Sequence, residues 1–153
     1  LAWVTGHRDI IDRLVTAKQS ADLCTPPFVQ KITARYIEQG LLDVNLKKTV
    51  ELYKYRRDYM RSCFRELMPE GVKWTEPEGG LFLFVTLPPS MDAARLLEKA
   101  IRKNVAFVCG SVFYCNNEGH NTLRMNFSFA GEKDTHEGIR RLAEVISEEM
   151  AAS

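Results

Sequence analysis

An apolar stripe with helical spacing, between residues 43 and 67, constrains the fold of this chain more than any other feature. Its side chains follow one another in alternating steps of four and three residues, which is the period of one buried face of a long helix. Asp43 is a suitable N-cap, and Pro69 and Gly71 end the pattern. The sequence therefore predicts a long helix with one packed face. The stripe consists of Leu46, Val50, Tyr53, Arg57, Met60, Phe64 and Leu67.

The segment before this helix is predicted to be helical after a short start. Residues 9–23 and 26–39 carry apolar positions at helical spacing, and two prolines open the second of these helices. Residues 1–5 are predicted to be the end of a strand. Because this apolar run begins at the very first residue, we expect the chain to have been cut out of something longer.

After the long helix, short β-rich runs alternate with helices. Asp134, with Glu137 three residues later, forms a capping box that is expected to begin the last helix. The predicted fold class is therefore α+β, a small mixed or antiparallel sheet covered by helices and preceded by the long helix. Strands are predicted at 72–75, 81–87, 105–109 and 123–129, and a further helix at 91–104.

Composition excludes several classes of function. The 153 residues carry a net charge of +1 and are 45% hydrophobic, so the charge balance does not favour a nucleic-acid partner. The longest apolar runs are too short to cross a membrane. Cys115 and His120 lack a second pair of ligands at the spacing of a zinc site, and no C-x-x-C motif occurs. We therefore expect no metal site, no nucleic-acid partner, no membrane partner and free thiols.

Six segments of the chain, taken in order, resemble one family. They are residues 1–6, 18–25, the Tyr-x-x-Arg-Arg-Asp segment 53–58, the Glu-Gly-Gly-Leu-Phe-Leu-Phe segment 78–84, 105–113 and 121–128. They resemble the class I/II aminotransferases of fold type I, which depend on pyridoxal phosphate, and within them the 2-aminoadipate, kynurenine and aromatic aminotransferase branch. The resemblance implies the C-terminal part of such an enzyme. Residues 1–42 are then a remnant of the end of the large domain, and 43–153 are the small domain with its interdomain helix.

The resemblance also implies an activity. The parent enzyme transfers an amino group between an amino acid and a 2-oxo acid with pyridoxal 5'-phosphate as cofactor. The large domain of the same chain is an implied partner, and a homodimer is the usual state of the complete family member. Separately from the resemblance, the free thiols favour a cytoplasmic location. A non-catalytic alternative keeps the fold, because some winged-helix transcription regulators carry an aminotransferase-like effector domain. A free-standing binding module without cofactor is a third interpretation, against which the abrupt apolar start argues.

Two departures limit what this chain can do by itself. In the family, the lysine that binds the cofactor covalently, the aspartate beside the pyridinium nitrogen and the phosphate-binding loop lie upstream of the matched segments, and none is in this sequence. Lys18 lies in a helix and not in a Ser-x-x-Lys turn. We therefore expect no catalytic residue, no cofactor-binding residue and no activity from this chain alone. Cys109 stands where the family usually has proline, which is expected to loosen the turn before Gly110.

Arg124 is the first candidate for a substrate-binding residue. It is a lone cation in an apolar strand, and its planar fork of donors suits a bidentate grip on a carboxylate. The resemblance implies that it binds the α-carboxylate of the substrate, whereas the sequence alone leaves open that it faces solvent or a structural carboxylate. Asn126 follows on the same strand face and either orients that guanidinium or makes a plain structural hydrogen bond. Phe82 lines the pocket or the core, and Gly80 either serves substrate entry or forms a simple turn.

Overall fold

The computed structural model describes residues 1–152 and contains two compact units, and the boundary between them in the sequence lies between Thr49 and Val50. The helix α3 (Leu41–Leu67) begins in the first unit and ends in the second. The prediction that the domains divide between residues 42 and 43 stays a prediction. Within residues 1–152, no helix combines the length and the apolar character that crossing a lipid bilayer requires.

The first unit consists of helices. α1 (Arg8–Ala21) starts where the His7 side chain accepts a hydrogen bond from Asp9 N, and α2 (Pro27–Glu38) has proline in its first turn, where no amide donor is needed. Neither α1 nor α2 buries a residue. The strand predicted at residues 1–5 is wrong for the described structure, in which these residues are exposed and pair with no neighbouring strand.

The long helix is confirmed, but its cap is not. α3 begins at Leu41, and Val44 N already donates to Gly40 O, so Asp43 lies inside the first turn. Gly40 adopts a φ of +69°, which glycine accepts without strain, and this allows the chain to pass directly from α2 into α3. With Asp43 as its cap the helix would begin at residue 44, so it starts three residues earlier than the cap prediction places it.

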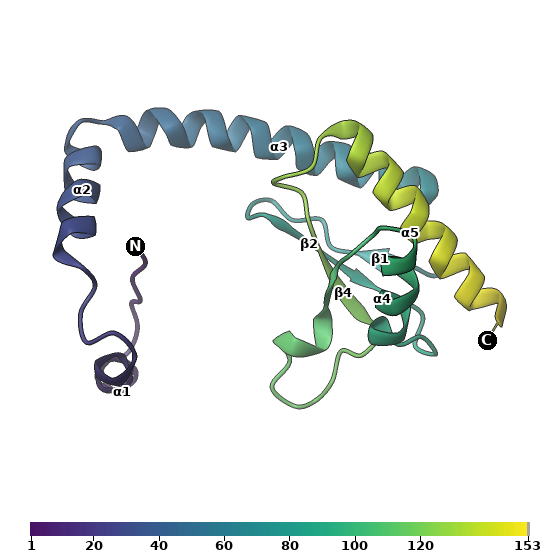
Figure 1. Cartoon of the computed structure of the whole chain (residues 1–153), viewed down its shortest axis with the longest axis horizontal. Coiled ribbons are helices and arrows are strands. Elements are labelled where there is room, and N and C mark those ends of the chain that lie inside the picture. Colours follow the sequence, from purple (N-terminus) through teal and green to yellow (C-terminus); the bar gives the residue numbers. More distant parts are fainter. Residues whose placement is uncertain (153) are drawn as a thin grey trace. The chain divides into compact units, whose positions relative to one another are not determined.

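The second unit is a four-stranded antiparallel sheet with helices on one face. Its strands are β1 (Lys73–Trp74), β2 (Phe82–Thr86), β3 (Val108–Cys109) and β4 (Thr122–Asn126), in the order β1-β2-β4-β3. The register pairs Phe84 with Arg124, and Val108 with the same arginine from the other side. α4 (Ala93–Arg102), the short 3-10 helix η1 (Gly110–Phe113) and α5 (Glu132–Ala152) complete the unit (Figure 1). The predicted α+β class with a small helix-covered sheet is confirmed.

The core lies between this sheet and three helices. Leu83, Val85 and Leu123 point to the same side of the sheet and are completely buried. The C-terminal part of α3, together with α4 and α5, supplies the rest of the hydrophobic cluster. The helical members include Met60, Cys63, Phe64, Leu96, Ala100, Ile139, Leu142, Val145 and Ile146. The stripe of α3 is therefore buried only from Met60 onward, while Leu46 and Val50 are more than half exposed.

The capping box predicted at the start of the last helix is wrong. α5 begins at Glu132, and Thr135 N donates to Gly131 O, so Asp134 is a first-turn residue. Glu137 does not reach back to a cap. It accepts two hydrogen bonds of 2.8 Å from Arg140 and one of 2.8 Å from Arg141. Near the C-terminal end of α5, Met150 is 36% exposed.

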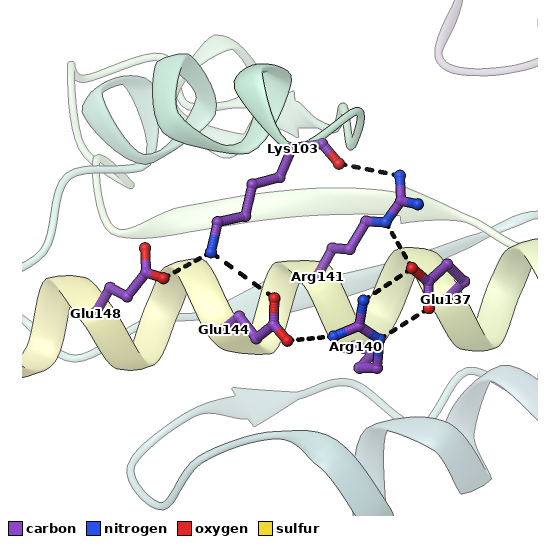
Figure 2. A network of polar contacts seen from close by, with 6 residues as sticks. All are labelled: Lys103, Glu137, Arg140, Arg141, Glu144 and Glu148. Carbon is purple, nitrogen blue, oxygen red and sulfur yellow. Dashed lines mark hydrogen bonds and ion pairs between the residues drawn. The ribbon is translucent and has the colours of Figure 1, made fainter.

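A charged network on α5 reaches the end of α4 (Figure 2). Arg141 Nη1 donates to the Lys103 carbonyl at 3.1 Å, and Lys103 Nζ lies 2.6 Å from Glu148 Oε1. Arg140 also pairs with Glu144. Because these groups are partly solvated, each pair stabilises weakly, but the network aligns α5 with the C-cap of α4.

We expect this network to make stability depend on acidity through Glu137. Hydrogen bonds from Arg140 and Arg141 lower the pKa of Glu137 to about 2. Since the folded pKa lies below the unfolded one, the stabilisation is complete above the unfolded value and is lost as the pH falls toward about 2. A Glu137→Gln variant lacks this stabilisation by an ionised carboxylate. Its melting temperature should therefore fall less between about pH 5 and about pH 2 than that of the wild type. Glu98→Gln, at an exposed position of α4, is the control and should follow the wild type. Equal slopes for Glu137→Gln and the wild type would contradict the expectation.

Candidate functional site

Arg124 lies on the face of β4 that points away from the core. Its neighbour Leu123 is completely buried on the opposite face, as the alternation of side chains along a strand requires. Across the sheet, Arg124 has Phe84 beside it on β2 and Val108 beside it on β3. The arginine is partly buried and lies between two strands of the sheet, with aromatic side chains on the same face.

Two aromatic rings, here called the aromatic clamp, contact the guanidinium of Arg124. Its Cζ lies 3.8 Å from the ring centroid of Phe82 and 4.4 Å from that of Phe113. A guanidinium stacks well on an aromatic face, because the ring carries negative charge density there. Phe113 in turn meets Phe84 edge-on, with the ring centroids 6.1 Å apart. The clamp therefore joins β2 and η1 to the arginine of β4.

Arg124 has no polar partner among residues 1–152. Its Nε is buried and donates to no acceptor, and within the described part of the chain its other nitrogens make no ion pair or hydrogen bond. The other partly buried arginines of residues 50–152 all find acceptors. They are Arg56, bound to Ser128 O, Arg57, bound to Pro77 O at 3.2 Å, Arg61, paired with Glu76, and Arg140 and Arg141, paired with Glu137. Burying a cation without a counter-ion costs free energy of folding, unless an anion from outside these residues pairs with it.

A cavity of about 490 Å³ opens beside Arg124. Phe82, Arg124 and Asn126 line it together with residues from β3, the end of α3 and the first turns of α5. Its lining is mostly apolar, with Arg124 as its cation and Asp134 as its acid. Such a hollow, apolar with few charged groups, is typical of a small-molecule site.

The remaining predicted residues lie differently. Asn126 does not hydrogen-bond to Arg124, because its Oδ1 accepts from both Ser128 N and Ser128 Oγ at 2.8 Å. Gly80 does not line the cavity. It has a φ of +78° and open space around its Cβ position, so glycine serves the turn before β2 and no close contact among the described residues. Cys109 stands where the family usually has proline. Its side chain is half-buried, and this burial raises the pKa of its thiol.

Phe113 is the contact that the sequence did not assign to the site. It lies in η1, and the structure leaves its side chain 46% exposed and against the guanidinium of Arg124. No periodicity reveals this contact, because η1 and β4 are separated by a loop in the sequence.

Comparison with known proteins decides the family. The sequence profile described as "Aminotransferase class I and II" matches residues 1–146. This chain belongs to that family. The resemblance carried by the six sequence segments is thereby confirmed.

Three relatives of this aminotransferase chain represent the predicted branch. It is 47% identical over 150 residues to the aromatic-amino-acid aminotransferase 1 of Thermococcus litoralis, covering 98% of this chain and 36% of that protein. It is 32% identical over 146 residues to the 2-aminoadipate transaminase of Thermus thermophilus, covering 95% of this chain and 36% of that protein. The crystal structure of a Pyrococcus horikoshii kynurenine aminotransferase, in complex with PMP, KYN and KYA, matches with a TM-score of 0.84 and 48% identity over 94% of this chain and 35% of that one. The chain therefore spans about a third of the length of the curated relatives it matches.

A more distant relative belongs to another class. The uncharacterized HTH-type transcriptional regulator YdfD of Bacillus subtilis is 27% identical over 148 residues, covering 97% of this aminotransferase chain and 30% of that protein.

The described residues of this aminotransferase chain do not fit a covalent cofactor site. A lysine that binds an aldehyde needs a desolvated or cationic surrounding that lowers its pKa. Eight of the nine lysines are exposed, and the half-buried Lys103 is paired with Glu144 and Glu148. Those carboxylates raise the pKa of Lys103, which is the direction opposite to activation. No chemical step of the cofactor is therefore assigned to a residue of this chain.

Proposed function

We propose that this chain is the substrate-carboxylate-binding part of a pyridoxal-phosphate-dependent aminotransferase. The complete enzyme would transfer an amino group between an amino acid and a 2-oxo acid. The observation that carries the proposal is Arg124, a partly buried guanidinium that contacts two aromatic rings and has no counter-ion among residues 1–152. Both substrates carry a carboxylate, which a guanidinium binds with two parallel hydrogen bonds.

The role of the chain is then orientation. Arg124 would hold the carboxylate through its terminal nitrogens, while Phe82 and Asn126 form the wall of the cavity beside it. A fixed carboxylate determines which bond of the amino acid faces the reacting centre, and such positioning lowers the barrier by removing rotational freedom before the reaction. Gly80 would act indirectly, since its turn leads into β2 and so to Phe82.

The activity itself belongs to the complete protein. The cofactor supplies the electron sink for the reaction, and its covalent site would lie in the large domain, with residues 1–42 as the end of that domain and 43–153 as the small domain. A homodimer, from the resemblance, and a cytoplasmic location, from the free thiols, are further predictions. The family membership and the PMP of the kynurenine aminotransferase complex support the cofactor assignment.

An amino-transfer assay of the full-length protein tests this proposal. The protein, saturated with pyridoxal phosphate, should convert at least one amino acid of a panel of apolar, aromatic and acidic members to its 2-oxo acid in the presence of a 2-oxo acid acceptor. Mass spectrometry of both products measures the exchange. Absence of exchange with every amino acid, in protein that binds the cofactor, would contradict the proposal.

A second candidate is the effector domain of a transcription regulator, which the similarity to YdfD favours. In that case the full-length protein would bind DNA through a separate head domain, and its carboxylate site would sense a ligand without turnover. Measuring DNA binding alongside amino transfer separates the two, since the enzyme should transfer amino groups and show no specific DNA affinity.

A further inference from the structure

We propose that Phe113 is a positioning residue, which holds the guanidinium of Arg124 in the orientation that receives a carboxylate. This inference rests on the proposed function, because it concerns the same carboxylate. It adds a residue outside β4 whose effect is exerted through Arg124 and not through contact with the reacting atoms.

The argument begins with the freedom of an arginine side chain. A long side chain loses rotational entropy when it is fixed, so an arginine that binds ligand well is usually fixed beforehand. The other partly buried arginines of residues 50–152 are fixed by oxygen acceptors, as Arg56 is by Ser128 O. Arg124 has no such acceptor in the described structure, and the rings of Phe82 and Phe113 are its close contacts.

Holding an arginine with rings has a chemical advantage over holding it with a carboxylate. A ring face attracts the cation through its π electrons and takes up none of the N–H donors in a hydrogen bond. A structural carboxylate would occupy the same donors that the substrate requires and would compete with it. In Arg124 only Nε is fully buried without a partner, so the terminal nitrogens keep access to a ligand. The aromatic clamp thus orients the guanidinium and leaves its donors free.

The chain around Phe113 is built to bring η1 close to β4. Gly110, the first residue of η1, is buried, and a Cβ there would lie 1.9 Å from Thr122 Oγ1. Only glycine therefore permits this approach. Thr122 is itself held by a hydrogen bond to Gly119 O, and Phe84 contacts the edge of the Phe113 ring. These contacts determine where Phe113 lies relative to Arg124.

Kinetics of the full-length protein with conservative variants test the inference. Phe113→Leu keeps an apolar side chain but removes the π face, so KM should rise about tenfold for both the amino acid and the 2-oxo acid. The value of kcat should change less than about twofold, and the affinity for pyridoxal phosphate should stay the same. Phe113→Tyr keeps the ring and should retain a KM close to that of the wild type. Val112→Ala, at a 69% exposed position of the same short helix, is the matched control and should also retain it.

Each outcome decides something different. An unchanged KM in Phe113→Leu would overturn the inference, as would a joint loss of cofactor affinity and melting temperature that Phe113→Tyr does not restore. If the wild type is inactive toward every amino acid, the proposed function fails, and this inference fails with it. If the wild type is active and Phe113→Leu is indistinguishable from it, only the inference fails.

Discussion

Replacement of Arg124 by lysine should lower kcat/KM for the amino acid by about 100- to 1000-fold in the full-length protein. Lysine keeps the charge but loses the planar fork, so a two-point grip becomes a single contact made by a flexible side chain. Its ammonium also stacks less well on the rings of Phe82 and Phe113. The affinity for pyridoxal phosphate should change little, since Arg124 is assigned to the substrate. Steady-state kinetics and cofactor titration measure the two quantities separately.

Arg102→Lys is the matched control for this variant. Arg102 is exposed at the end of α4, so the same chemical change there should leave both quantities near their wild-type values. Equal losses of amino-acid and cofactor binding in Arg124→Lys would refute the assigned role. They would indicate that the arginine supports the fold and not the substrate.

Truncation of Leu142 to alanine should reduce the free energy of unfolding by about 3 kcal/mol. Leu142 is completely buried on α5, within the cluster that also contains Leu83 and Leu123 of the sheet. Removing three carbons from a close-packed site loses the burial of their apolar surface. It also leaves a cavity, whose lining atoms lose their van der Waals contacts. Leucine and alanine are both strong helix formers, so the backbone of α5 contributes little to the change.

Leu52→Ala provides the comparison with the same chemistry at the surface. Leu52 is 45% exposed on α3, and its truncation should cost less than about 1 kcal/mol. Urea unfolding followed by circular dichroism measures both variants. Similar losses in the two would mean that α5 does not pack on the sheet as the structure has it.

The sequence predicted the elements better than their ends. The stripe of α3, the strands around Phe84 and Arg124, and the helix α5 follow from the period of apolar residues, because burial of one face requires that period. The caps at Asp43 and Asp134 failed for a common reason. A cap residue is a local preference worth about 1 kcal/mol, and the hydrogen bonds of each helix continued past it toward the glycine before its first turn.

Some residues of the candidate site could likewise be predicted from the sequence, and others could not. Arg124 was predictable, because a lone cation in an apolar strand needs a reason and the six resembling segments supplied one. The strand alternation also puts Phe84 and Arg124 on one face once their register is known. The hydrogen bonds of Asn126 to Ser128 were not predictable, since they depend on how the chain turns after β4.

The sequence by itself determined most of the helices and strands, the family and the arginine at the centre of the candidate site. Only the tertiary structure decided what surrounds that arginine. Phe82, Phe113 and Arg124 come from three segments, and they meet because β2 pairs with β4 while Gly110 lets η1 approach Thr122. Periodic patterns record which face of one element is buried. Contacts between elements depend on strand register, on how closely two segments approach, and on whether a polar side chain finds a hydrogen-bond acceptor nearby. These become definite only when the chain is folded.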